Sequence, residues 1–245
     1  MVKEFRCDLH IHSCLSPCAE LEMYPSAVVA ASLNWGLDII GICDHNASEN
    51  VRYVIKAAEN TPLTVFPGME VTSKEEVHIL GLFENVESLY KLQEIVYGAL
   101  PGENDEDIFG CQAIVNELDE VEGFNKRLLI GSTTLSLRYL TEAIKDLQGI
   151  AVAAHIDRES FGIIGQLGFI PDDVRFDALE VSFRTDFRTA RLRYPELAHQ
   201  PIIQSSDAHR IEEIGRGGTV IRLEKPTVAE LKLALSRRGG RYIVE

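Results

Sequence analysis

Short runs of apolar residues recur along the whole chain and are separated by longer, more polar stretches. Apolar runs of this length, bounded by turn residues, are typical of buried strands. They predict strands at 7–12, 37–43, 63–67, 77–83, 150–154, 178–182, 201–205, 219–223 and 241–244. The stretches between them predict helices at 25–35, 49–60, 86–97, 108–121, 131–148 and 227–237. Gly36 and Gly149 follow two of these helices, as a C-terminal glycine commonly does.

The alternation of strands and helices predicts a parallel α/β architecture over residues 1–245, organised as one domain. Polar residues gather just after the carboxyl ends of successive strands, which is where a TIM-like barrel carries its active site. A doubly wound open sheet would need a glycine-rich phosphate loop after its first strand, and this sequence has none there. We therefore expect a single-domain barrel.

Cysteine usage and hydropathy indicate where the chain works. Five cysteines without paired spacing indicate a reducing compartment. The first strand begins too early to leave room for a signal peptide. No apolar run is long enough to span a membrane. We therefore expect a cytoplasmic protein without membrane contact.

The formal charge of −14 bears on the partners of the chain. Binding to a nucleic-acid backbone requires a basic footprint, so the charge predicts that no extended nucleic-acid surface is present. A small phosphorylated substrate is still compatible with this charge, because bound divalent cations can reverse the sign inside one pocket.

The first strand carries the pattern on which the functional prediction rests. His10 and His12 are two residues apart, so their side chains share one face of the strand, while Leu9 and Ile11 point to the other. Two imidazoles on one face form half of a metal site, and imidazole binds zinc, iron, copper or nickel.

Six of the seven histidines lie at or beside expected strand ends, together with two carboxylates. These eight residues are His10, His12, His45, His78, His155, His209, Glu70 and Asp207. Eight donors exceed what one ion can use, so the pattern predicts two or three metal ions with Glu70 as a bridge. Multinuclear sites suit phosphate-ester hydrolysis. We expect Asp8 and Asp44 to hold the second nitrogens of ligand imidazoles, and His199 to lie on the surface.

The motifs Asp-Leu-His-Ile-His, Asp-His, Gly-Met-Glu, Val-His, Ala-His and Ser-Asp-Ala-His follow one another between Asp8 and His209. In this order they resemble the PHP (polymerase and histidinol phosphatase) family. The resemblance implies a distorted (β/α)7 barrel, a trinuclear zinc, manganese or iron centre, and phosphoesterase activity. By motif it implies the ligands His10, His12, His45, Glu70, His78, His155, Asp207 and His209.

One further ligand of the family lies in the loop after the first strand and is commonly Asp or His. Cys18 stands at this position in the present sequence. Thiolates bind zinc and iron well and manganese poorly, so we expect Cys18 to be a ligand that favours the softer ions.

The expected reaction begins with attack of a metal-bound hydroxide on phosphorus at the centre that Glu70 bridges. We expect His155 or His209 to protonate the leaving group. Arg158 and Arg184 lie at the expected rim of the pocket and are predicted to bind the substrate, because a guanidinium fork suits phosphate oxygens. Three further arginines, Arg188, Arg191 and Arg193, are expected on a solvated helix face.

Two other functions fit parts of the pattern. An amidohydrolase-type enzyme acting on C–N bonds also uses a His-x-His first strand, but the fourth strand lacks the lysine that often bridges metals in such sites. A non-catalytic accessory domain would be expected to have lost ligands, and no clear loss is visible. The leading prediction is a phosphoesterase for a small phosphorylated metabolite or nucleotide, with monoesters and diesters both open.

Overall fold

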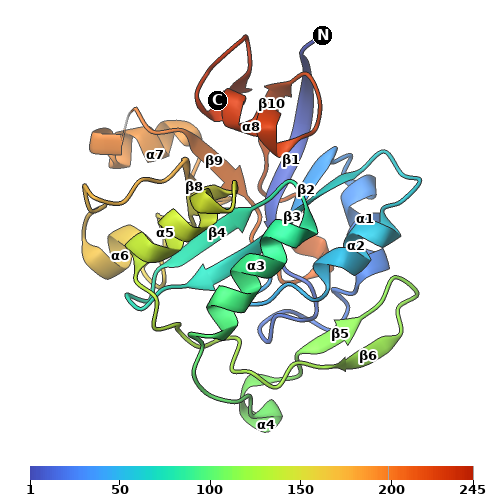
Figure 1. The fold of residues 1–245 in the computed structure, drawn as a ribbon. Helices are drawn as coiled ribbons and strands as arrows, with labels where there is room; N and C mark the ends of the chain where they lie inside the picture. Colours follow the sequence, from blue (N-terminus) through green and yellow to red (C-terminus); the bar gives the residue numbers. More distant parts are fainter. Residues whose placement is uncertain (198, 245) are drawn as a thin grey trace.

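The computed structural model describes residues 1–197 and 199–244, and a curved sheet of nine strands lies at its centre (Figure 1). The spatial order of the strands is β11, β10, β1, β2, β3, β4, β7, β8 and β9. Their bounds are β1 Lys3–Ile11, β2 Ile39–Ile42, β3 Thr64–Thr72, β4 His78–Leu82, β7 Ile150–Ala153, β8 Ala178–Ser182, β9 Ile202–Ser205, β10 Thr219–Leu223 and β11 Tyr242–Val244. Each apolar run of the sequence therefore forms a strand of this sheet.

The sheet curves until its two halves meet beside β1. Ile11 and Ala208 form a parallel bridge there, and the His12 N–H donates to the Ala208 carbonyl at 3.0 Å. This contact brings the end of β9 against the end of β1 and nearly closes the sheet into a barrel. The predicted TIM-like α/β fold is thereby confirmed.

The expected parallel architecture is wrong at two places in the sheet: at β4, and at one edge, where β10 is antiparallel to β1 and β11 is antiparallel to β10. β1, β2 and β3 run parallel to one another, and so do β7, β8 and β9. β4 is antiparallel to both of its neighbours, β3 and β7. β3 and β4 form a hairpin, in which the Ser73 N–H donates to the Val77 carbonyl at 2.9 Å. The connection is too short for the helical crossover that a parallel pair requires.

Most of the helices cover the outer side of the sheet, whereas α4 lies apart from it (Figure 1). Their bounds are α1 Pro25–Asn34, α2 Val51–Ala57, α3 Val86–Tyr97, α4 Glu106–Phe109, α5 Leu137–Asp146, α6 Ile163–Leu167, α7 Phe187–Arg193 and α8 Val228–Leu235, with 3-10 turns at Pro195–Leu197 and Ile211–Glu213. Asn85 and Ser136 begin α3 and α5 by accepting a hydrogen bond from a backbone N–H of the first turn. Leu89 and Leu92 of α3 are fully buried in the main apolar cluster. No helix in the described part of the chain is long and apolar enough to cross a membrane.

The helix expected at 108–121 is wrong. α4 covers only its first residues, and the remainder forms a small separate hairpin of β5 (Ala113–Val115) and β6 (Val121–Phe124). Gly110 ends α4 with a φ of 86°, a value that few other residues tolerate. Asn116 then caps the turn by accepting hydrogen bonds from the Leu118 and Glu120 N–H groups. These turn residues override the apolar spacing that favoured a helix.

A polar cluster fixes the hairpin to the rest of the molecule. The Tyr97 hydroxyl donates to Glu49 Oε1 at 2.5 Å, and Asn125 Nδ2 donates to the same oxygen at 3.0 Å. Arg127 stacks on the Tyr97 ring at 3.9 Å. The segment that follows the hairpin reaches the barrel end, where Asn46 Nδ2 donates to the carbonyls of Leu129 and Gly131. The insertion therefore helps to form the rim of the barrel mouth.

Candidate metal centre

The residues singled out in the sequence meet at one end of the barrel. His10 lies on β1 and His12 just after it, His45 follows β2, Glu70 is on β3, His78 opens β4, His155 follows β7, and Asp207 and His209 follow β9. The carboxyl ends of parallel strands share one edge of a sheet. His78 reaches the same edge from the beginning of its strand, because β4 runs in the opposite direction. Seven of the eight side chains are buried, and His209 is half-buried.

The Glu70 carboxylate is the centre of this arrangement. Five imidazole nitrogens from four segments of the chain surround its two oxygens at 2.8–3.5 Å. In order of increasing distance they belong to His78 (2.8 Å), His45 (3.1 Å), His155 (3.2 Å), His12 (3.3 Å) and His10 (3.5 Å). Two oxygens cannot hydrogen-bond well to five nitrogens at once.

Several of these buried atoms accordingly have no hydrogen-bond partner. Among the described residues they include Glu70 Oε2, His45 Nδ1 and His78 Nδ1. A buried polar atom without a partner costs about 1–3 kcal/mol, so proteins seldom leave such atoms together. Divalent cations would use these lone pairs directly. The donor set therefore fits bound metal ions.

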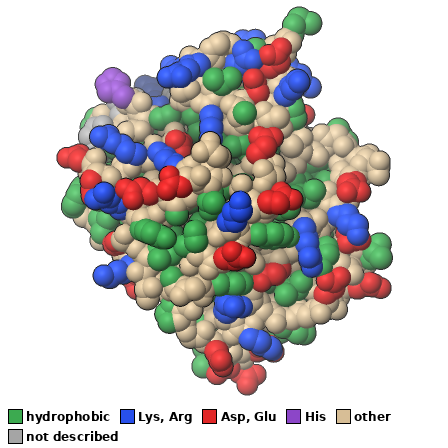
Figure 2. Space-filling view, viewed as in Figure 1, with side chains coloured by type: hydrophobic (Ala, Val, Ile, Leu, Met, Phe, Trp, Pro, Cys, Tyr) green, Lys and Arg blue, Asp and Glu red, His purple; other side chains and the backbone are tan. Residues whose placement is uncertain are grey.

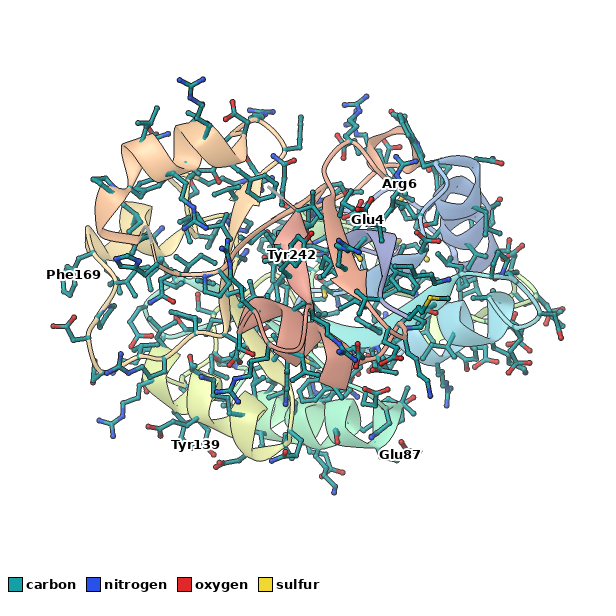
Figure 3. The ribbon with its side chains drawn as sticks, turned by 90° about the horizontal axis from the view of Figure 1, so that it is seen from above. Glu4, Arg6, Glu87, Tyr139, Phe169 and Tyr242 are labelled. Carbon is teal, nitrogen blue, oxygen red and sulfur yellow. The ribbon has the colours of Figure 1, made fainter. Side chains whose placement is uncertain are left out.

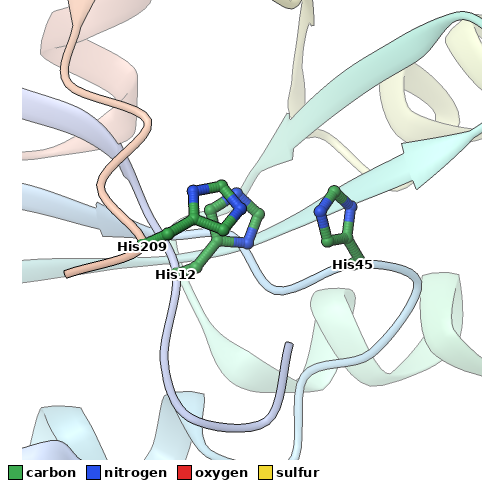
Figure 4. A group of neighbouring side chains, drawn as sticks. All are labelled: His12, His45 and His209. Atoms are coloured by element: carbon green, nitrogen blue, oxygen red, sulfur yellow. The ribbon is translucent and has the colours of Figure 1, made fainter. Parts of the chain in front are cut away.

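The donor atoms divide into three overlapping groups, each lying within 4.8 Å. The groups are His10 with His12, Glu70 and Asp207; His45 with Glu70 and His78; and His12 with His45 and His209. Figure 4 shows the rings of the last group, with His12 and His209 stacked at a centroid distance of 4.1 Å. Glu70, His12 and His45 each belong to two groups. Of these three residues only Glu70 could bind two ions at once, because each imidazole nitrogen has a single lone pair.

Charges around the first strand hold protons on its imidazoles when no cation is bound. Burial lowers the pKa of His10, but Glu180, Asp207 and Glu70 outweigh it and raise this pKa well above its usual range. Asp207 and Glu70 likewise overcome burial and raise the pKa of His12 to about 9. A metal ion must displace these protons, because only neutral imidazole is a ligand.

His45 and His209, which do not belong to the first strand, have lowered pKa values. Burial, reinforced by neighbouring imidazoles, lowers the pKa of His45 well below its usual range. Burial and the charge of His12 lower the pKa of His209 to about 4. Both side chains are therefore neutral near pH 7, in the form that binds metal.

Glu180 is a residue of the candidate site that the sequence analysis missed. It lies on β8, is 1% exposed, and places Oε1 3.0 Å from His10 Nδ1. The same oxygen accepts the His155 backbone N–H at 3.2 Å. Glu180 thus orients one expected ligand through its side chain and another through its main chain. The sequence did carry a signal for Glu180, because it is the only charged residue in the otherwise mostly apolar strand 178–182.

The expected roles of Asp8 and Asp44 are wrong. Asp8 accepts the backbone N–H groups of Ser206 and Gly215, both at 3.0 Å, and so ties β1 to the segments around β9. Asp44 accepts the Ser16 hydroxyl at 2.7 Å, and Ser16 Oγ lies 2.9 Å from His12 Nδ1. Asp44 therefore supports His12 through a serine, since its own carboxylate is fully occupied in the loop after β1.

An open pocket of about 810 Å³ lies above the centre. Arg158 and Arg184 line it as expected, and Arg193 joins them although it was expected on a solvated face. Arg158 Nη1 lies 2.5 Å from Asp207 Oδ2. Arg191, by contrast, donates to the carbonyls of Leu197 and Gln200.

Cys18 and His199, which the sequence analysis also considered, both lie outside the three compact donor groups. Cys18 lines the same pocket and is exposed, but its sulfur belongs to none of the three compact donor groups. Its role as a ligand stays a prediction. His199 is exposed and lines a separate surface depression.

Solved structures of other proteins share the fold of this chain. No family model and no curated protein sequence matches this chain. The crystal structure of the lesion-specific endonuclease Q from Pyrococcus furiosus matches it with a TM-score of 0.79 at 19% sequence identity, covering 98% of this chain. This chain has the fold of endonuclease Q. It spans 58% of the length of that protein.

A second structure supports the same fold. A protein assigned as a metal-dependent phosphoesterase from Bifidobacterium adolescentis has a TM-score of 0.54 at 17% identity, with 83% of this chain and 87% of that chain covered. Identities at this level establish the fold. The barrel implied by the resemblance to the PHP family is therefore confirmed.

The expectation that no extended nucleic-acid surface is present was wrong. Endonuclease Q has been crystallised with a 27-mer duplex whose abasic lesion lies at the active site, and this chain matches that complex with a TM-score of 0.77. Net charge is a sum over the molecule, whereas contact with nucleic acid depends on local cations. Figure 2 shows basic and acidic side chains interspersed over one face. The net charge of −14 therefore does not exclude binding of nucleic acid at a single pocket.

Proposed function

We propose that this chain is a metal-dependent hydrolase of phosphate esters. The observation that carries the proposal is the buried Glu70 carboxylate, which five imidazoles surround and whose Oε2 has no hydrogen-bond partner. Two or three divalent ions, either zinc, manganese or iron, would be held by His10, His12, Cys18, His45, Glu70, His78, His155, Asp207 and His209. When bound, such ions act as Lewis acids toward phosphoryl oxygens and lower the pKa of bound water.

The residues of the chain supply binding, orientation and proton transfer. Glu70 joins the two donor groups that contain it. Arg158 and Arg184 bind phosphoryl oxygens from the pocket side, and the contact of Arg158 with Asp207 would hold its guanidinium group beside the metal centre. His155 delivers the proton to the leaving oxygen, since it lines the pocket. His209, the other candidate, also lines the pocket but is neutral near pH 7, which is the form that binds metal.

The two competing functions have less support. The described residues that line the pocket include three arginines and no lysine, which does not favour a C–N hydrolase with a modified lysine bridge. An accessory domain would not need Arg158, Arg184 and Arg193 to converge on one open pocket. The five cysteines are free, in keeping with the reducing, cytoplasmic environment that we propose.

Hydrolysis of a small substrate panel tests the proposal, followed as phosphate release from the monoesters and as strand cleavage of the DNA. The metal-free protein is loaded with manganese, zinc or iron and incubated with an aliphatic monoester, a mononucleotide, a 3′,5′-bisphosphate, and a DNA duplex carrying an abasic site. We expect hydrolysis of at least one ester that depends on the added metal. Protein that binds two or more ions and still cleaves none of these esters would contradict the proposal and favour an accessory role.

A further inference from the structure

The loop that follows β7 folds back sharply over the metal centre. His155 and Phe161 have φ values of 27° and 60°, in a region that bulky residues rarely occupy. Gly162 permits this fold, because a Cβ there would lie 2.5 Å from the Arg158 carbonyl oxygen. The reversal places Arg158 and Phe161 on the wall of the same pocket. The loop therefore presents a cation and an aromatic ring together.

Phe161 lies directly against an expected metal ligand. Its ring stacks on the His78 imidazole with a centroid distance of 4.5 Å and an interplanar angle of 15°. Its carbonyl also accepts the His78 backbone N–H at 2.9 Å. Phe161 nevertheless remains 37% exposed and lines the pocket, and Ile130 is another apolar residue of its lining.

Core packing does not account for this ring, since a core phenylalanine would be fully buried. A partly exposed aromatic ring beside arginines is the combination by which proteins hold the base and phosphate of a nucleotide. The pocket volume of about 810 Å³ accommodates a group much larger than phosphate.

We propose that Phe161 forms a subsite for the ring of an unpaired nucleobase, and that the substrate is a phosphate ester of a nucleoside. The base stacks on Phe161 while Arg158 and Arg184 hold the phosphate over the metal centre. This inference rests on the proposed phosphoesterase function for its chemistry, but the subsite itself is a binding property. The alternative is that Phe161 only shields and positions His78.

Two variants and one control separate these possibilities. Phe161→Leu removes the aromatic face but keeps an apolar cover over His78, and Phe161→Tyr keeps the face. Phe169→Leu is the matched control, because Phe169 is 62% exposed and lies at the periphery of the molecule in Figure 3. Turnover of adenosine monophosphate and of glycerol phosphate is compared after the metal content of each variant has been measured.

We expect Phe161→Leu to lower kcat/KM for adenosine monophosphate by roughly 5- to 150-fold, the range for losing one base–aromatic stack. Activity on glycerol phosphate, which has no ring, should stay within about twofold of the unmodified protein, because the same stack makes no contribution there. Phe161→Tyr and Phe169→Leu should leave both activities near their original values. An equal loss for both esters, or a loss of metal, would assign Phe161 to shielding His78 and overturn the subsite.

Calorimetry with the metal-loaded protein keeps the inference testable if neither ester is hydrolysed. The probes are an adenosine phosphonate, in which carbon replaces the scissile oxygen, and methylphosphonate as its ringless counterpart. Tighter binding of the adenosine compound that Phe161→Leu abolishes would support the subsite even if the phosphoesterase proposal failed. Equal affinity for the two phosphonates in the unmodified protein would overturn it.

Discussion

Replacement of Glu180 by glutamine tests how the barrel tunes its expected metal ligands. Glutamine keeps the size of the side chain and an acceptor oxygen for His10 Nδ1, which lies 3.0 Å away in the present structure. It also keeps an acceptor for the His155 backbone N–H. The change therefore removes one negative charge from a site that is 1% exposed and alters little else.

The expected result is weaker metal binding. Loss of a carboxylate that holds a ligand imidazole typically lowers metal affinity by about 10- to 100-fold, or ~1.4–2.7 kcal/mol. An opposing effect comes from protons, because Glu180 helps to raise the pKa of His10 well above its usual range. Below that pKa the unmodified protein must release a proton to bind metal, and Glu180→Gln reduces this penalty. We therefore expect the affinity deficit to be small near pH 6 and to grow as the pH rises.

Competition with a chromogenic zinc chelator at several pH values measures this deficit. Glu49→Gln is the control, because Glu49 is also hydrogen-bonded and partly buried but serves the contact with Tyr97 and Asn125. Glu49→Gln should lower the thermal midpoint without changing zinc affinity. Unchanged zinc affinity in Glu180→Gln at every pH, or an equal deficit in both variants, would refute the role assigned to Glu180.

Three further changes test the centre itself. Glu70→Gln should lower both metal content and turnover, because one carboxylate serves two donor groups, whereas His199→Ala on the exposed surface should change neither. Cys18→Asp should shift the preference from zinc toward manganese if the thiolate is a ligand; an unchanged metal profile would make Cys18 a non-ligand. Removal of bound ions with a chelator should lower the thermal midpoint by roughly 5–10 °C if their binding contributes ~2.7 kcal/mol. Differential scanning calorimetry with and without added metal measures that shift.

The convergence of the histidines could be predicted from sequence because it depends on local rules. His10 and His12 share a face by strand alternation, and His45 and His155 directly follow apolar runs. The partner of each imidazole could not be predicted in this way. Glu180 contacts His10 across 170 positions of sequence, and its alignment depends on how closely β8 approaches β1 in the closed barrel.

The insertion after α3 illustrates a different limit. Its apolar spacing favoured a helix, but Gly110 and the turn at Asn116 allow a hairpin, and the hairpin is fixed by Glu49 from a distant loop. An isolated two-stranded hairpin is marginally stable at best, so it depends on such contacts, which include hydrogen bonds of Asn50 with Ala113 and Val115. Secondary structure here is set by tertiary packing, which local periodicity does not report.

The direction of β4 could have been deduced, and His78 shows why it matters. Glu70 on β3 and His78 on β4 are eight positions apart, whereas a parallel crossover needs about a dozen residues or more. The chain must therefore turn back as a hairpin. Had β4 been parallel, His78 at its first residue would lie at the far edge of the sheet, about 13–16 Å from the strand's other end. The reversal instead brings His78 Nδ1 to 2.8 Å from Glu70 Oε1, so a local length restriction determines the composition of the metal centre.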